Sequence, residues 1–164
     1  MEDCLFCKIG KKEIAVKAVA VNETAVAFMD INPVAPGHTV VIPKKHAAAI
    51  MEMDDAELSS LFLLVRQAAS QIQSGLACDG LNIGINQGKA AGWGVPHVHV
   101  HIIPRFENDG GGSMHTIVRN PPHESIDAIY EKIRAREQEK KPEPAREEKK
   151  PAPKKLPPEW ELEL

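Results

Sequence analysis

The sequence predicts an α+β fold in which a five-stranded antiparallel sheet is accompanied by two helices. Short runs rich in Val, Ile and Thr mostly follow one another in adjacent pairs, and turn residues such as Asn, Pro and Gly separate them. Only two stretches have the apolar spacing of a helix. A doubly wound parallel sheet needs a helix after nearly every strand, so this order favours the antiparallel arrangement.

Each predicted strand is marked by its composition and by the residues that end it. Residues 15–21 and 24–29 have the pattern of a β-hairpin around an Asn-Glu turn, and residues 38–42 form a third apolar run that follows a Pro-Gly turn and stops at a proline. Residues 81–86 alternate apolar and polar side chains, as a half-buried strand does. A glycine-rich loop then leads to the last strand, residues 97–103, which a proline also ends.

The two predicted helices differ in how clearly their ends are signalled. Asp54 or Asp55 caps the first, with Glu57 at capping-box spacing from Asp54, and Gly75 ends it. The second is expected from about residue 124 to residue 134. The apolar face of the first helix is expected to contain Leu58, Leu61, Phe62, Val65, Ala68, Ala69 and Ile72.

The composition changes sharply near residue 135. Residues 135–164 contain eight Lys or Arg, eight Glu and six Pro, a mixture that cannot bury enough apolar surface to offset chain entropy. We therefore expect one domain over residues 1–134 and a charged, flexible tail over residues 135–164, with a helical continuation at its start. Near the end of the tail, Trp160, Leu162 and Leu164 either dock on the domain or a second subunit, or stay exposed.

Overall composition excludes several classes of protein. The 164 residues carry a net charge of −3, which argues against a nucleic-acid binder that relies on a general basic field. No apolar run is long enough for a membrane span, and the first residues lack the pattern of a signal peptide. Three cysteines are an odd number for a secreted disulfide framework. We therefore expect a cytoplasmic protein with no membrane partner.

Three histidines at alternate positions give the last strand an unusual face. His97, His99 and His101 point to one side, and valine and isoleucine side chains point to the other. Because the apolar side is suited to burial, the histidines must face a cleft or a polar pocket. One metal ion cannot bind all three, since a strand separates His97 from His101 by about 13 Å while metal–nitrogen bonds are about 2 Å long. Separate roles are therefore expected.

Histidine chemistry and the preceding loop both suit a phosphoryl group. Imidazole is half neutral near pH 7 and forms a labile phosphoramidate when it attacks phosphorus. A neighbouring imidazolium can stabilise charge on phosphoryl oxygens or protonate a leaving group. The glycine-rich residues 88–94 offer backbone N–H groups and room for a phosphate to approach. Together these features predict phosphate chemistry.

The pattern His-φ-His-φ-His-φ-φ at residues 97–103 resembles that of the histidine triad (HIT) superfamily, and the chain is most similar to its Hint-like branch. The resemblance extends from Cys4 to about Arg105. It includes the segments Asp3-Cys4-Leu5-Phe6-Cys7-Lys8-Ile9, Phe28-Met29-Asp30-Ile31-Asn32-Pro33, Gly37-His38, Ile42-Pro43-Lys44-Lys45-His46 and Asn86-Gln87-Gly88. This resemblance implies a homodimer whose antiparallel sheets join across the interface.

The resemblance also implies a purine nucleotide substrate that is cleaved at its α-phosphate, as in nucleoside phosphoramidases or dinucleoside polyphosphate hydrolases. His99 is then the nucleophile that takes the nucleotidyl group, and His101 hydrogen-bonds the phosphate with Asn86 nearby. Asp30 is implied to bind the ribose hydroxyls. His38 is expected only to begin a strand. The remaining nucleotide-binding residues that the resemblance implies are Phe28, Ile31, Gly92, Trp93, Gly94 and Val95.

One departure from the superfamily concerns the group that leaves the phosphate. After Gly92 the superfamily usually has Gln, and its phosphoramidase branch often has Ser next; these side chains serve the phosphate or the leaving group. This chain has Trp93 and Gly94 there. The nucleophile needs neither, so hydrolysis stays the prediction, while the preferred leaving group is left open. Trp93 is a candidate for an aromatic wall or a dimer contact.

A second candidate site begins with Cys4-x-x-Cys7, two soft ligands at the spacing of a zinc finger. In many bacterial HIT proteins the partners of this pair are histidines, and the resemblance implies His46 and His97 here. A Cys2His2 zinc ion would then be structural, and the chemistry itself would require no metal. Reduced thiols or a disulfide are the alternatives.

The leading hypothesis is therefore a nucleotide hydrolase or transferase that works through a nucleotidyl-histidine intermediate. A nucleotide-binding or scaffold protein with weak or vestigial activity is the alternative, which Trp93-Gly94 and the long tail favour. A DNA-end deadenylating enzyme is weaker still, because the chain lacks a basic surface and an appended zinc finger, so a nucleic-acid partner is not expected.

Overall fold

The structure is a computed structural model that describes residues 3–139. The chain divides into two compact units, residues 1–118 and residues 119–164. In the second unit the described residues form helix α3 (Ile126–Glu139), which begins and ends later than the sequence predicts. The predicted boundary after residue 134 falls inside α3 and stays a prediction, because residues 140–164 of the predicted tail lie outside the described residues.

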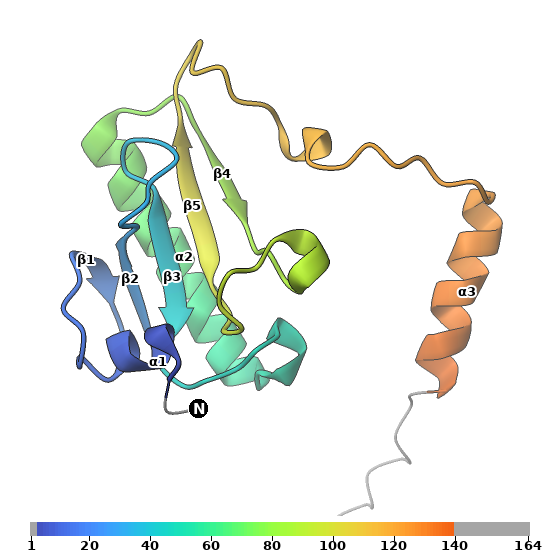
Figure 1. Ribbon diagram of the computed structural model, residues 1–164, viewed down its shortest axis with the longest axis horizontal. Coiled ribbons are helices and arrows are strands. Elements are labelled where there is room, and N and C mark those ends of the chain that lie inside the picture. The colour runs from blue at the N-terminus through green and yellow to red at the C-terminus, as the bar shows by residue number, and fades with distance from the viewer. Residues whose placement is uncertain (1–2, 140–164) are drawn as a thin grey trace, which may run out of the picture. The chain divides into compact units, whose positions relative to one another are not determined.

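The first unit contains the predicted five-stranded antiparallel sheet. In spatial order it consists of β1 (Ala18–Val21), β2 (Ala25–Met29), β3 (Thr39–Pro43), β5 (Val100–Arg105) and β4 (Gly80–Gly84) (Figure 1). The β1–β2 hairpin is confirmed. Strand β5 lies between β3 and β4, so His101 on it is held from both sides. The expected α+β class is confirmed.

Helix α2 (Asp55–Leu76) covers one face of the sheet, behind the strands in Figure 1. Asp54 is its N-cap and accepts a hydrogen bond from the Glu57 N–H, as the sequence predicts. The prediction for Phe62 is wrong: it is 44% exposed, and Leu64 is buried instead. Residues three, four and seven positions after Leu61 lie on the same face of the helix, and this is the buried face. Phe62 lies about a quarter-turn around the helix from it. The buried residues are Leu61, Leu64, Val65, Ala68, Ala69 and Ile72.

Helix α1 (Leu5–Gly10) lies on the opposite face of the sheet, in front of β3 in Figure 1. Its six residues are too few for a recognisable helical periodicity, which explains why the sequence did not predict it. Ile9 packs there with residues of β2 and β3 in a small apolar cluster. Val100 and Ile102 of β5 point the other way, into the core under α2, so His101 faces the α1 side.

Strand β5 differs from its prediction at both ends. It begins at Val100 rather than residue 97, so two of the three histidines precede it, and it continues through Pro104 to Arg105. Strand β3 pairs with β5 only as far as Ile102, so β4 is the single neighbour at Pro104. A strand tolerates proline where one of its edges is unpaired.

Three short 3-10 helices lie in the loops: η1 (Ile50–Glu52), η2 (Lys89–Ala91) and η3 (Met114–Thr116). Helix η2 lies within the glycine-rich loop. None of the helices within residues 3–139 combines the length and the apolar character that crossing a bilayer requires.

Candidate functional site

A cavity of about 480 Å³, called here the histidine cavity, opens on the α1 face of the sheet. This volume is within the range of small-molecule sites. Apolar side chains of α1, of the segment that follows it, and of β2 and β3 form one part of its wall. Of the site residues inferred from the sequence, it brings together Phe28, Asp30, Ile31, Asn86, Gly92, Gly94, Val95, His99 and His101.

Trp93 is the exception among the residues inferred for nucleotide binding. Its indole is half-buried, and it is not part of the cavity wall, although Gly92 and Gly94 on either side of it are. The backbone N–H of Trp93 donates to the Gly88 carbonyl at 3.4 Å, which closes the glycine-rich loop on itself. Its suggested role stays a prediction.

His99 presents one particular ring nitrogen to the cavity. The ring is buried, and its Nδ1 lies 2.6 Å from the backbone carbonyl oxygen of His97. Because a carbonyl oxygen can only accept, Nδ1 must carry the proton in the neutral ring. Nε2 then keeps its lone pair, as a nucleophile requires. Phe6 of α1 packs beside the ring with 5.2 Å between centroids and limits its rotation.

His101 is oriented by a second buried histidine, His38. The Val34 N–H donates to His38 Nδ1 at 3.3 Å, so the proton of the neutral His38 ring is on Nε2. His38 Nε2 lies 3.0 Å from His101 Nδ1 and donates to it. His101 must therefore carry its own proton on Nε2. Asp30 stands behind this pair, with Oδ2 at 3.6 Å from His38 Nδ1.

Burial keeps both members of this pair neutral at pH 7. It lowers the pKa of His38, and the nearby Asp30 carboxylate only partly opposes that effect. It also lowers the pKa of His101 to about 4, and repulsion from His99 and His38 adds to the effect. The neutral His101 ring can thus donate one N–H to a ligand oxygen without carrying a charge.

His38 is a residue whose importance the sequence reasoning missed. It was expected only to begin a strand, and it lies immediately before β3. However, it is 4% exposed and contacts His101, which is 63 residues away. A histidine directly after a Pro-Gly turn was the available signal, but its partner is set by the pairing of β3 with β5, in which Val40 lies opposite His101.

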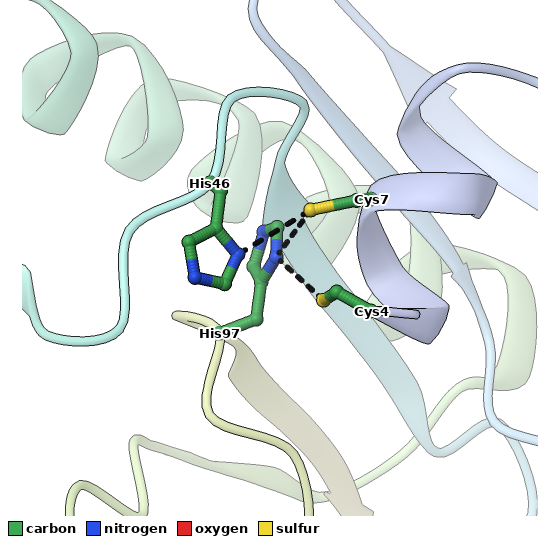
Figure 2. A group of neighbouring side chains, drawn as sticks. All are labelled: Cys4, Cys7, His46 and His97. Atoms are coloured by element: carbon green, nitrogen blue, oxygen red, sulfur yellow. Dashed lines mark hydrogen bonds between the residues drawn. The ribbon is translucent and has the colours of Figure 1, made fainter. Parts of the chain in front are cut away.

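The four predicted metal ligands meet beside the histidine cavity (Figure 2). Cys4 is the N-cap of α1 and Cys7 lies within that helix. His46 follows β3, and His97 precedes β5. Their ligand atoms all lie within 4.8 Å of one another. Cys4 Sγ is 3.4 Å and Cys7 Sγ is 3.6 Å from His97 Nδ1, and Cys7 Sγ is 3.3 Å from His46 Nδ1. The cysteines are free thiols, not a disulfide.

These distances fit a tetrahedral ion. Zinc–sulfur bonds of about 2.3 Å and zinc–nitrogen bonds of about 2.0–2.1 Å place the ligand atoms roughly 3.3–3.8 Å apart. His97 Nε2 donates to the Pro43 carbonyl at 2.9 Å, so the lone pair of Nδ1 points at the two thiols. Burial and the neighbouring Cys4 raise the pKa of Cys7, so the protein groups alone do not favour its thiolate. A divalent cation would supply the missing charge.

Two further features, a cavity and a cysteine, lie outside the histidine cavity and the four metal-ligand candidates. A further cavity of about 430 Å³, near Arg105 and Met114, contains none of the predicted site residues. Cys78 is buried and has no place in either cluster of possible metal ligands found among residues 3–139.

Comparison with known proteins supports the resemblance. The family model "HIT domain" matches residues 11–108. An adenosine 5'-monophosphoramidase of Schizosaccharomyces pombe is 37% identical over 108 residues, or 66% of this chain and 78% of that protein. A bis(5'-nucleosyl)-tetraphosphatase (asymmetrical) of the same organism is 41% identical over 88 residues, or 54% of this chain and 48% of that protein.

Comparison with solved structures gives the same family. The crystal structure of a HIT family protein from Bacillus subtilis superposes with a TM-score of 0.73 at 32% identity, and covers 87% of this chain and 99% of that one. The matched region contains the sheet, α2 and the histidines at 97, 99 and 101. This chain belongs to the histidine triad family.

Proposed function

We propose that this protein is a nucleotide hydrolase or transferase that cleaves at the α-phosphate of a purine nucleoside phosphoramidate or dinucleoside polyphosphate. The observation that carries the proposal is the tautomer of His99, whose free Nε2 is available to a cavity large enough for a nucleotide. Membership of a family with hydrolase members supports it.

The reaction has two balanced steps. First, His99 Nε2 forms a bond to the α-phosphorus while the bond from phosphorus to the leaving group breaks, and the leaving group takes the electron pair. The product is a nucleotidyl-histidine intermediate. In the second step a water oxygen bonds to phosphorus, the bond to Nε2 breaks and one proton is released. A nucleoside monophosphate results, and His99 regains its free lone pair. With an acceptor alcohol in place of water, the same step is a transfer.

The other cavity residues have supporting roles in this proposal. The His101 Nε2–H donates to a non-bridging phosphate oxygen as charge grows there. Asn86 offers an amide to the same group, and Gly92 lets the phosphate approach the loop backbone. Asp30, which accepts from the Asn32 N–H at 2.9 Å, is held in place to accept from ribose hydroxyls. Phe28, Ile31 and their apolar neighbours surround the base.

The test replaces the nucleophile. We expect His99→Gly to lower kcat/KM by about a thousandfold or more on whichever of adenosine 5'-phosphoramidate and diadenosine tetraphosphate the parent cleaves, because the covalent route is lost. His115→Gly, at an exposed histidine outside the cavity, is the control and should retain full turnover. Rapid quenching of the parent with denaturant at alkaline pH, during turnover of a substrate labelled in its nucleotidyl group, should trap label on one histidine, because acid would cleave the phosphorus–nitrogen bond. Full turnover by His99→Gly contradicts the mechanism.

A nucleotide-binding protein with vestigial activity is the second candidate. It is favoured by Gly94, which brings no side chain to the cavity wall, and by Trp93, which lies outside that wall. Calorimetry that detects tight binding of adenosine or guanosine monophosphate, together with no turnover of adenosine 5'-phosphoramidate or diadenosine tetraphosphate, would decide for this candidate.

We also propose that Cys4, Cys7, His46 and His97 hold a structural zinc ion that fastens α1 to the sheet. The ion takes no part in either chemical step. Metal analysis of the purified protein should find about one zinc per chain. Removal by a chelator, or Cys7→Ser, should lower the midpoint of thermal unfolding, whereas Cys78→Ser should leave the zinc content unchanged.

A homodimer completes the proposal. Strand β4 is an edge strand of the described sheet, and Ile83 on it is 42% exposed, so its free backbone groups can pair with a second copy. Light scattering should give twice the mass of the 164-residue chain. A cytoplasmic location is proposed from the three free thiols and is tested by cell fractionation.

A further inference from the structure

The glycine-rich loop separates two residues on which the proposed reaction depends. Asn86 precedes the loop and His99 follows it, and both line the histidine cavity. Asn86 lies beyond the end of β4, and His99 lies before the start of β5, so strand pairing fixes neither of them. Glycines give the backbone of the loop between them unusual freedom. The alignment of the two residues therefore depends on contacts with other parts of the chain.

The segment that leads into η1 provides such a contact on the side of His99. The Ala47 carbonyl accepts a hydrogen bond from the Val98 N–H at 2.7 Å, and both residues are buried in the core under α2. This N–H belongs to the same peptide group as the His97 carbonyl, which binds His99 Nδ1. Because a peptide group is planar and rigid, Ala47 holds from one side the group that orients the His99 ring from the other.

Gln87, the neighbour of Asn86, joins the same segment to the other side of the loop. Its Oε1 accepts a hydrogen bond from the Ile50 N–H at 2.8 Å, and its Nε2 donates to Met51 Sδ at 3.3 Å. A backbone N–H can only donate and a thioether sulfur can only accept, so these two partners determine how the amide is turned. Ile50 packs against the core under α2, which anchors the segment.

Together these contacts form a series of hydrogen bonds between the two sides of the cavity that does not pass through the glycine-rich loop. The Glu52 carboxylate accepts from the Ala48 N–H at 2.9 Å, which stiffens the shared segment. Gln87 and His99 contribute side chains to the series, and its other groups belong to the backbone. Gln87 is therefore the position at which a substitution can open the series without changing the nucleophile.

We propose that Gln87 is a positioning residue of the histidine cavity, whose side-chain oxygen keeps Asn86 aligned with His99 Nε2 so that both act on the same phosphate. This inference rests on the proposed function and adds to it a residue that is not part of the cavity wall. Gln87 does not touch the substrate and acts through Asn86. A misplacement of about 1 Å can cost about a hundredfold in rate, so even a partial loss of alignment should be measurable.

The first measurement is kinetic and uses the full chain with whichever of adenosine 5'-phosphoramidate and diadenosine tetraphosphate the parent cleaves. In Gln87→Leu we expect kcat to fall by about tenfold and KM to change by less than about twofold, because other elements contact the base and the ribose. Gln87→Glu keeps an acceptor oxygen for the Ile50 N–H, so its kcat should stay within about threefold of the parent. Gln73→Leu, at an exposed glutamine of α2 outside the cavity, is the control and should keep full turnover.

The second measurement is amide hydrogen exchange of the same proteins, with their zinc content matched. In Gln87→Leu the Ile50 N–H should exchange at least about tenfold faster, because it has lost its acceptor, whereas in Gln87→Glu it should stay protected. The Val98 N–H should stay protected in every variant, since its acceptor is a backbone carbonyl. Gln87→Ala also removes the acceptor, adds no branched side chain, and decides the matter if Gln87→Leu does not fold.

Three results would overturn the inference: unchanged exchange of the Ile50 N–H in Gln87→Leu, an unchanged kcat despite faster exchange, or a loss of kcat in Gln87→Glu as large as that in Gln87→Leu. In each of these the parent still hydrolyses a nucleotide, so the proposed function survives. If the parent cleaves neither substrate, the proposed function fails and this inference fails with it.

Discussion

The buried histidines differ from one another in the nitrogen that each leaves free. The Pro43 carbonyl binds Nε2 of His97 and turns its Nδ1 toward the two thiols. The His97 carbonyl binds Nδ1 of His99, so that Nε2 is free. His38 donates to Nδ1 of His101, so that the Nε2 of this ring is an N–H donor. One short segment thus presents a free Nδ1 beside two thiols, a free Nε2 and an N–H donor, because each ring has a different hydrogen-bond partner.

At the residue scale, we expect His38→Ala to lower kcat/KM by about tenfold, because His101 loses the hydrogen bond that fixes its tautomer. Nitrogen NMR of the His101 ring should change from one tautomer in the parent to a mixture in the variant. His38→Gln keeps an N–H donor and should recover part of the activity. An unchanged His101 spectrum in His38→Ala would exclude this positioning role.

At the scale of elements, the end of α2 shows where sequence signals mislead. Gly75 is the expected stop, but it lies inside the helix, and the residue in the left-handed conformation is Ala77, with φ of 49°. Glycine is favoured at a left-handed position that ends a helix, but here the glycine lies two residues before that position. The sequence signal therefore predicts the end of the helix two residues too early. The alternating apolar pattern of the strands, by contrast, correctly assigns Val100 and Ile102 to the core and His101 to the opposite face.

This geometry predicts stabilisation by two opposite substitutions. Gly75→Ala should raise the free energy of unfolding by about 0.5–1 kcal/mol, since alanine is favoured inside a helix and its Cβ meets no atom within 4 Å. Ala77→Gly should also stabilise, by relieving the left-handed strain. Urea unfolding measures both. If Gly75 were the left-handed cap that the sequence suggests, Gly75→Ala would destabilise the protein instead.

For the whole molecule, the buried histidines make stability depend on pH. Burial lowers the pKa of His38, His97 and His101 in the folded state, below the 6.5 of an unperturbed histidine. As the pH falls below about 6.5, the unfolded chain binds protons that the folded protein does not, so the free energy of unfolding decreases. For His101 this loss continues until about pH 4, where the folded ring is also protonated.

His101→Gln isolates this contribution. Between pH 7 and pH 4 the parent should lose more stability than the variant, by an amount on the order of 1 kcal/mol after allowance for solvent screening of a partly exposed ring. Urea unfolding at several pH values, with the zinc content of both proteins matched, provides the measurement. If the free energy of unfolding changed with pH in the same way in both proteins, His101 would bind protons equally in the folded and unfolded states.

The amino-acid sequence determined the fold class, the cap of α2 and the side of the sheet on which the histidines lie, because these follow from local periodicity and from short-range hydrogen bonds. It also indicated the residues of the cavity through ordered motifs. Only the tertiary structure decided that His38 contacts His101 and that Trp93 lies outside the cavity wall. Those facts depend on strand register and loop packing, which bring together residues that lie far apart in the chain and leave no periodic signal in it.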